Sequence, residues 1–195
     1  MIWVFCALAY LLGSIPFGLI VAKVYGADLR SKGSGNIGAT NALRVIGKKA
    51  GALTLLGDML KGAAAVLIAL NFAGYEAGVI AAGAAVIGHD FPVFARFKGG
   101  KGVATSLGAL LALEPYIGIA CLSIWVIAFL AFRISSVGAL AAFAALPVLV
   151  LILKSFNYPL IMLSFFLAFM IFIKHRENIK RLIKGEEKGF SGKQP

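Results

Sequence analysis

The stretch "MIWVFCALAYLLGSIPFGLIVAKV" (residues 1–24) opens the chain with a long apolar run whose one charged residue is Lys23. The hydrocarbon core of a bilayer is about 30 Å thick, and a helix of roughly 20 apolar residues crosses it. No basic residue precedes the run, and the run is too long for the apolar core of a cleaved signal peptide. We therefore expect this segment to remain in the protein as a membrane-spanning helix.

The composition of the whole chain is that of an integral membrane protein. Of its 195 residues, 61% are hydrophobic and 14% are charged, and the mean hydropathy is +0.94, outside the range of soluble domains. Apolar runs predict an all-α protein with seven transmembrane helices, at 2–24, 52–72, 75–94, 103–113, 115–132, 137–153 and 158–173. A helix over 103–113 would extend only about 17 Å, so this run could instead be a half-helix entered from a re-entrant loop.

The basic residues predict the orientation of these spans. The net charge is +11, from 19 Lys and Arg against 8 Asp and Glu. With seven spans, every cation except Lys61 and Lys154 falls on one side, whereas six spans would violate the positive-inside rule. We expect the N-terminus outside and the C-terminus in the cytoplasm. We also expect one transmembrane domain over 1–195, with 175–195 as a basic, partly amphipathic cytoplasmic tail.

A glycine-rich stretch, "KGSGNIGATNALR" (residues 32–44), lies between the first two predicted spans. Its glycines allow backbone amides to converge, and its hydroxyl and amide side chains add hydrogen-bond donors. Thr40 is the expected N-cap of a short helix that carries Arg44 and ends at Gly47. An anion is the natural occupant, and an ordinary surface turn is the alternative. The predicted ligands are Gly33, Ser34, Gly35, Asn36, Gly38, Thr40, Asn41 and Arg44.

A second polar stretch, "GHDFPVFARFKGGKGVATSLG" (residues 88–108), predicts another anion site. Two lysines flank a glycine pair, and a helix is expected to begin near Val103 with its positive end toward the loop. A nucleotide P-loop is excluded, because Lys101 is followed by Gly102 and not by Ser or Thr. The predicted ligands are Lys98, Gly99, Gly100, Lys101, Gly102 and Thr105.

A third stretch, "KHRENIKRLIKGEEKGF" (residues 174–190), follows the last predicted span. On a helix, His175 and Asn178 fall within the arc of the apolar residues, so we expect both to be buried. A buried imidazole and amide need partners. The charged residues of the segment are expected to face water: Arg176, Glu177, Lys180, Arg181 and Lys184.

Charged and hydroxyl side chains at the spans themselves complete the set of candidates. Asp58 and Lys61 lie three residues apart on one predicted helix, where we expect a structural ion pair that braces the loops. Ser135 and Ser136 open the sixth span on the cytoplasmic side, as hydroxyl donors or as helix caps.

Two cationic glycine loops and a buried His–Asn pair on one side indicate two phosphorylated ligands that meet at the membrane surface. If one is a fatty acyl phosphate, its leaving group is already good, and transfer requires proximity, charge neutralisation and a route for a hydroxyl proton. An organophosphate or anion transporter is the alternative, although it would need polar groups through the bilayer midplane. A scaffold that binds anionic headgroups would leave both glycine loops unexplained.

Four segments also resemble the characteristic segments of the bacterial membrane glycerol-3-phosphate acyltransferases that use acyl phosphate: "GSIPFG" (13–18), "GSGNIGATNALR" (33–44), "GHDFPVFARFKGGKGVAT" (88–105) and "HRENIKRL" (175–182). The resemblance implies a seven-helix enzyme of the bacterial inner membrane. It would transfer an acyl group to the 1-hydroxyl of sn-glycerol 3-phosphate, giving 1-acylglycerol 3-phosphate (lysophosphatidic acid) and phosphate in phospholipid synthesis. It implies no metal or other cofactor, no nucleic acid, and neither coenzyme A nor acyl carrier protein as direct donor.

Carried over by position, the resemblance implies five catalytic residues: Ser34, Arg44, Lys101, His175 and Asn178. Ser136 is the expected serine after the fifth span, and Arg176 joins the expected substrate ligands. In this hypothesis Lys101, Arg44 and the loop amides hold phosphate. His175, held by Asn178, orients or deprotonates the glycerol hydroxyl. The donor phosphate could take that proton instead, which would leave His175 a positioning group.

Overall fold

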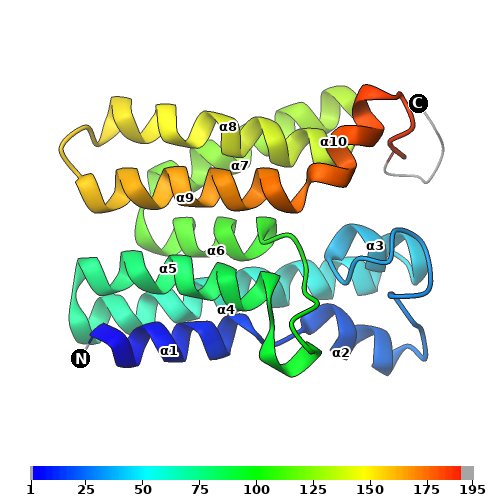
Figure 1. Cartoon of the computed structure of the whole chain (residues 1–195), viewed down its shortest axis with the longest axis horizontal. Coiled ribbons are helices and arrows are strands. Elements are labelled where there is room, and N and C mark those ends of the chain that lie inside the picture. The colour runs from blue at the N-terminus through cyan, green and yellow to red at the C-terminus, as the bar shows by residue number, and fades with distance from the viewer. Residues whose placement is uncertain (1, 190–195) are drawn as a thin grey trace.

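The computed structural model describes residues 2–189, and within that range the chain forms helices and loops only, which confirms the all-α prediction. The last six residues of the predicted tail, 190–195, lie outside the described residues. Figure 1 shows the long helices running nearly parallel to one another. In chain order the helices are α1 (Ile2–Gly13), α2 (Phe17–Val24), α3 (Ala39–Val45), α4 (Lys48–Ala73), α5 (Tyr75–Asp90), η1 (Val93–Ala95), α6 (Val103–Leu113), α7 (Pro115–Phe132), α8 (Ser135–Leu153), α9 (Tyr158–Lys174) and α10 (Arg176–Ile183).

Five segments of the described chain are long and apolar enough to cross a membrane: Ile2–Val24, Lys48–Ala73, Tyr75–Ala95, Pro115–Phe132 and Ser135–Leu153. The pair α9 and α10 passes the same test as one segment, with a bend of 61° between the two helices. The short α6 has 11 residues. Each predicted span therefore corresponds to a helical segment, and the number of full crossings depends on α6 and on the bent pair.

Two helices end earlier than the apolar runs predict. The first span is a single helix in the prediction, but the chain breaks between α1 and α2, because Pro16 has no backbone N–H to continue the helix. The break leaves the carbonyl of Ile15 free to accept a hydrogen bond from Lys61 Nζ at 2.8 Å. Likewise, α5 ends at Asp90 because Pro92 disfavours helical backbone in the residue before it.

The short helix α6 lies at the centre of the bundle, between α4 and α5 on one side and α7 on the other (Figure 1). Its backbone touches that of α4 through glycines. A Cβ atom on Gly62 would lie 2.2 Å from the Thr105 carbonyl oxygen, and one on Gly108 would lie 2.0 Å from the Met59 carbonyl oxygen. Small residues at such crossings are typical of membrane helices. The contact fixes the position of α6 and of the glycine loop that precedes it.

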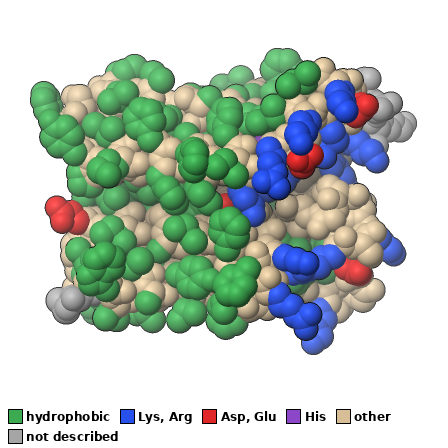
Figure 2. All heavy atoms as spheres, viewed as in Figure 1, with side chains coloured by type: hydrophobic (Ala, Val, Ile, Leu, Met, Phe, Trp, Pro, Cys, Tyr) green, Lys and Arg blue, Asp and Glu red, His purple; other side chains and the backbone are tan. Residues whose placement is uncertain are grey.

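The surface separates apolar and cationic regions. Figure 2 shows apolar side chains over the body of the molecule and Lys and Arg side chains gathered toward one end. At the opposite end, Glu114 accepts a hydrogen bond from the Tyr75 hydroxyl at 2.8 Å and pairs with Lys154 at 3.2 Å. This distribution matches the predicted one-sided placement of the cations, while the orientation in the membrane remains a prediction.

Candidate active site

A cavity of about 600 Å³ lies at the cationic end of the molecule. It is bounded by the loop before α3, by α4, by the start of α6, by α8 and by α10. All five residues that the sequence predicts as catalytic line it: Ser34, Arg44, Lys101, His175 and Asn178. Seven predicted substrate ligands line it as well: Gly33, Asn36, Gly38, Thr40, Asn41, Gly102 and Ser136. The three polar stretches, which are far apart in the sequence, thus share one space.

Six predicted ligands lie outside the lining of this cavity: Gly35, Lys98, Gly99, Gly100, Thr105 and Arg176. The Arg176 side chain is exposed and pairs with Glu177. Thr105 is buried against Gly62 of α4. Lys98 contributes a backbone carbonyl that accepts from the Arg30 guanidinium at 3.2 Å, which holds the loop in place. Lys98 thus supports the second glycine loop, whereas Thr105 packs α6 against α4 and Arg176 faces solvent.

Asn41 organises the first glycine loop. Its amide oxygen accepts from the Ser34 backbone N–H at 2.9 Å. Its amide nitrogen donates to the carbonyls of Leu29, Lys32 and Asn36 at 3.0, 3.2 and 2.8 Å. The side chain is therefore occupied with the backbone of its own loop, and its role is to shape the loop around Ser34.

The short helix after this loop begins earlier than predicted. Gly38 is its N-cap, and Thr40 lies inside α3 with its hydroxyl 3.1 Å from the Ser135 hydroxyl. The prediction of Thr40 as N-cap is wrong, because its hydroxyl contacts the start of α8 across the cavity wall. That contact joins the first glycine loop to α8.

The second glycine loop rests on a buried polar cluster. The Gly100 backbone N–H donates to the His89 carbonyl at 3.1 Å, and a Cβ atom on Gly100 would lie 2.1 Å from His89 Nε2. His89 Nδ1 is 3.4 Å from an Asp58 carboxylate oxygen, which Lys61 Nζ approaches to 2.8 Å. The predicted ion pair of Asp58 and Lys61 is confirmed, and it lies directly beneath the loop that carries Lys101.

Lys101 projects from this loop to the third cluster, where its ammonium donates a hydrogen bond to the Asn178 amide oxygen. Burial lowers the pKa of Lys101 to about 8, although the Glu187 carboxylate opposes this shift. Arg181, Arg44 and Lys174 lower that pKa further through charge repulsion. The ammonium is therefore charged at neutral pH but easily discharged, and an anion brought beside it would stabilise its charge.

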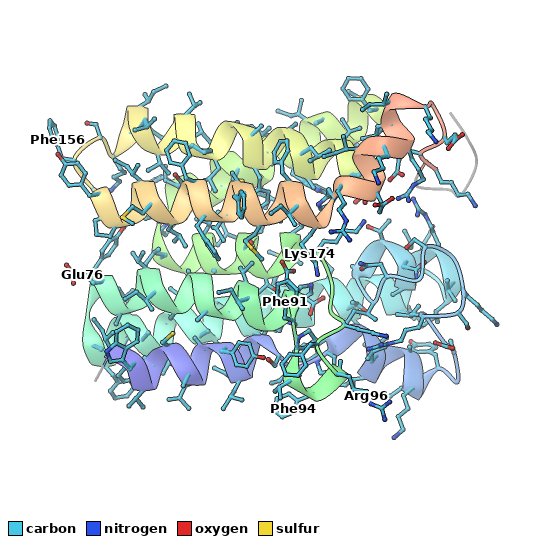
Figure 3. All side chains as sticks on the ribbon, viewed as in Figure 1. Glu76, Phe91, Phe94, Arg96, Phe156 and Lys174 are labelled. Atoms are coloured by element: carbon cyan, nitrogen blue, oxygen red, sulfur yellow. The ribbon has the colours of Figure 1, made fainter. Side chains whose placement is uncertain are left out.

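The end of α9 is anchored next to the cavity. Lys174 Nζ donates to the Asp90 carbonyl at 3.0 Å and lies 4.5 Å from the centre of the Phe91 ring. Figure 3 shows the side chains of Lys174 and Phe91 near one another. The next residue, His175, is buried, and its Nδ1 is 2.8 Å from the Ile171 carbonyl oxygen. A carbonyl only accepts, so Nδ1 carries the proton and Nε2 is left as the acceptor of the neutral ring.

Five further charged or titratable residues line the cavity without having been predicted as ligands: Asp58, His89, Arg181, Glu187 and Lys188. The Arg181 side chain is 40% exposed, in keeping with the prediction that it faces water, but its Nε also donates to Glu187 Oε2 at 2.6 Å, a contact that the sequence did not predict. The reason is a turn after α10 at Gly185, whose φ of +69° is left-handed, which brings the chain back over the helix. Placing the residues on one continuous helix cannot show a contact that forms after the helix ends, so the sequence did not predict the partner of Arg181. Gly185, a typical helix-stopping residue, was the available signal.

The other half of the cavity is apolar. Its lining there comes from helices α4, α6, α7 and α8, through Leu55, Met59, Leu107, Leu122, Trp125 and Ala139. A polar half that carries Lys101 and Arg44 and an apolar half within the helices suit a ligand with an anionic head and a hydrocarbon chain.

Comparison with known proteins finds relatives over nearly the whole chain. The family described as glycerol-3-phosphate acyltransferase matches residues 3–185. A glycerol-3-phosphate acyltransferase of Geotalea daltonii is 48% identical over 183 residues, which cover 93% of this chain and 94% of that protein. One of Jannaschia sp. is 52% identical over 184 residues, which cover 92% and 88%.

Two solved structures share the fold. Both are of PlsY (YgiH), an integral membrane glycerol 3-phosphate acyltransferase. The glycerol 3-phosphate form aligns with a TM-score of 0.92 and 38% identity over 96% of this chain and 94% of that chain. The lysophosphatidic acid form aligns with a TM-score of 0.90 and 37% identity over the same shares.

Proposed function

The chain belongs to the glycerol-3-phosphate acyltransferase family, and on this premise we propose how its cavity performs the reaction. It is an integral membrane acyltransferase that acylates glycerol 3-phosphate in phospholipid synthesis. As donor we propose an acyl phosphate, and as products 1-acylglycerol 3-phosphate and inorganic phosphate. The observation that carries the proposal is one cavity with cationic glycine loops at one end and an apolar lining at the other.

The polar half holds the two phosphates. We assign phosphate binding to Lys101, to Arg44 and to the loop around Ser34, whose backbone Asn41 fixes. Ammonium, guanidinium and backbone amides are the groups that bind phosphate in proteins. With both phosphates neutralised, the glycerol hydroxyl and the acyl carbonyl can approach each other without charge repulsion.

The chemical step needs no general acid. The 1-hydroxyl oxygen of glycerol 3-phosphate attacks the carbonyl carbon of the acyl phosphate, the new ester C–O bond forms, and the bond from that carbon to the phosphate oxygen breaks. Phosphate leaves with the bonding electron pair. The hydroxyl proton passes to His175 Nε2, the free acceptor of the ring, or to the departing phosphate.

The donor enters from the bilayer. The apolar half of the cavity is lined by α4, α7 and α8, which are long enough to span a membrane, and by the shorter α6, so a donor held in the membrane by its chain reaches it by lateral movement. We propose seven spans in the bacterial inner membrane, with the N-terminus outside and the cationic end in the cytoplasm. The water-soluble acceptor then meets the donor at the cytoplasmic surface, within a single domain.

A comparison of donors tests this function. We expect purified protein in detergent to form lysophosphatidic acid from sn-glycerol 3-phosphate and palmitoyl phosphate, and not from palmitoyl-coenzyme A. Comparable rates with both would contradict the proposed donor. Uptake of glycerol 3-phosphate into liposomes that contain the protein, without any lipid product, would favour the transporter alternative.

A further inference from the structure

Glu187 is a buried carboxylate inside a cavity whose other charges are mainly cationic. One oxygen, Oε1, accepts from the Ser136 hydroxyl at 2.8 Å and from the Asn178 amide nitrogen. The other oxygen, Oε2, accepts from Arg181 Nε at 2.6 Å. Burial opposes ionisation of Glu187, but these hydrogen bonds outweigh it and keep its pKa below the usual value. Glu187 is therefore ionised throughout the physiological range.

The contacts of Asn178 fix the orientation of its side-chain amide. Its amide nitrogen donates to Glu187, and its amide oxygen accepts from Lys101. A carboxylate only accepts and an ammonium only donates, so the amide has one orientation that satisfies both neighbours. The flipped amide would present its NH2 group to the ammonium of Lys101 and its oxygen to the carboxylate, and both contacts would be repulsive.

We propose that Glu187 is a positioning residue of the acyltransferase site, which orients the Asn178 amide so that its oxygen holds the Lys101 ammonium in place for phosphate. The inference rests on the proposed function. Glu187 needs no contact with substrate for this role, because it acts through Asn178. The chain on either side is held as well: Arg44 donates to the carbonyls of Lys188 and Gly189 at 3.0 and 2.9 Å.

Glu187 also sets the charge around Lys101. The charged groups that face Lys101 from the neighbouring elements are Arg44 on α3, Lys174 at the end of α9, Arg181 on α10 and Glu187 after α10, and the titratable ring of His175 faces it as well. Three of these are cations, and Glu187 is the one anion among them. Removing its charge would lower the pKa of Lys101 further, and the ammonium would discharge at a lower pH.

If Glu187 instead blocked the phosphate site, its removal would have the opposite effect on turnover. A carboxylate in an anion-binding cavity could occupy the place of a substrate phosphate and act as a plug. Removal of a plug lowers the KM for glycerol 3-phosphate and raises turnover. Removal of a positioning residue lowers kcat.

The test compares Glu187→Gln with Glu186→Gln in the full-length protein. Glu186 carries the same charge one residue earlier but is exposed to solvent, so it is a matched control. The measurements are kcat, the KM for sn-glycerol 3-phosphate with saturating palmitoyl phosphate, and kcat/KM against pH. The same substitution in an Asn178→Ala background tests whether Glu187 acts through Asn178.

We expect Glu187→Gln to lower kcat by roughly tenfold or more, to change the KM by less than about threefold, and to move the alkaline fall of kcat/KM to lower pH. In the Asn178→Ala background its effect on kcat should be below about twofold. Glu186→Gln should match the wild type. Unchanged kcat and pH profile in Glu187→Gln, or a lower KM with faster turnover, would overturn the proposal.

A second variant of Glu187 and a phosphate-binding measurement also test the proposal. If Glu187→Gln does not fold, Glu187→Asp replaces it. The shorter side chain keeps the negative charge but no longer reaches Asn178. We therefore expect kcat to fall, while the pH at which kcat/KM falls stays the same. An Asp variant with wild-type kcat would refute the positioning role. Calorimetric titration with inorganic phosphate at several pH values reports the same anion site without turnover. If the wild type forms no lysophosphatidic acid, the proposed function fails, and the phosphate titration still tests Glu187.

Discussion

The ammonium of Lys101 donates a hydrogen bond to the amide oxygen of Asn178, 77 residues further along the chain. This bond joins the second glycine loop to the start of α10, and Lys101 also stands in the same cavity as Ser34 and Arg44 of the first loop. Three stretches that are separate in the sequence thus act on one space. A substitution in any of the three stretches should therefore lower the activity more than it lowers the stability of the fold.

The pH dependence of the reaction should follow Lys101. Its pKa is lowered to about 8, so its ammonium is charged below that pH and loses its charge above it. Because a phosphate ligand needs the charged form, kcat/KM should be level near neutrality and fall as the pH rises through about 8. A Lys101→Arg variant keeps its charge to much higher pH, so whatever activity it retains should lack this fall. If kcat/KM fell at the same pH in the wild type and in Lys101→Arg, the fall would be due to the titration of another group.

Loss of either main cation should reduce turnover without unfolding the protein. We expect Lys101→Ala and Arg44→Ala to lower kcat/KM by roughly 100-fold or more, since each removes a charged donor to phosphate. Lys48→Ala is the control, because Lys48 is exposed at the start of α4 and lies outside the cavity. Initial rates and thermal unfolding in detergent provide the two readouts. Near-normal rates in both cavity variants would refute the assignment of phosphate to these side chains.

The second glycine loop should not tolerate a methyl group at Gly100. The new Cβ atom would lie 2.1 Å from His89 Nε2, so the loop must move and carry Lys101 with it. We expect Gly100→Ala to lower kcat/KM for glycerol 3-phosphate by about fivefold or more, because the phosphate donors are misplaced relative to the reacting groups. Gly83→Ala on α5 is the matched control, since its Cβ atom would make an ordinary 3.5 Å contact with the Phe166 ring. Equal kcat/KM values in the two variants would contradict a role for the loop geometry.

The buried pair of Asp58 and Lys61 should contribute to stability, in addition to any effect on activity of Asp58, which also lines the cavity. Both side chains are about 3% exposed, and removal of one partner leaves an uncompensated buried charge, which costs about 3–5 kcal/mol. Asp58→Asn and Lys61→Met should each lower the unfolding temperature in detergent clearly. The double variant should lose less than the sum of the two, since it leaves neither charge unpaired. Additive losses would show that the two residues act independently.

The spans and the three polar clusters could be predicted because their signals are local. Apolar runs, glycine loops and the arc shared by His175 and Asn178 all lie within short stretches, and the structure buries both residues as expected. The partner of Arg181 could not be predicted, because Glu187 reaches it only after the chain turns at Gly185.

Residue type alone also did not separate the side chains that face the cavity from those that shape its walls. Asn41 and Thr40 have the chemistry of phosphate ligands. The structure engages Asn41 with carbonyls of its own loop and Thr40 with Ser135. Which neighbours a polar side chain reaches depends on tertiary contacts that composition and spacing do not encode.

In the proposed reaction the acyl group passes directly between two ligands held in one cavity, with no acyl-enzyme on Ser34. The most direct test is rapid mixing of the enzyme with excess palmitoyl phosphate, with and without sn-glycerol 3-phosphate, while inorganic phosphate and lysophosphatidic acid are followed together. We predict phosphate release only when the acceptor is present, in equal amount to the lipid formed. A burst of phosphate equal to the enzyme concentration without acceptor would reveal a covalent intermediate and rule out direct transfer.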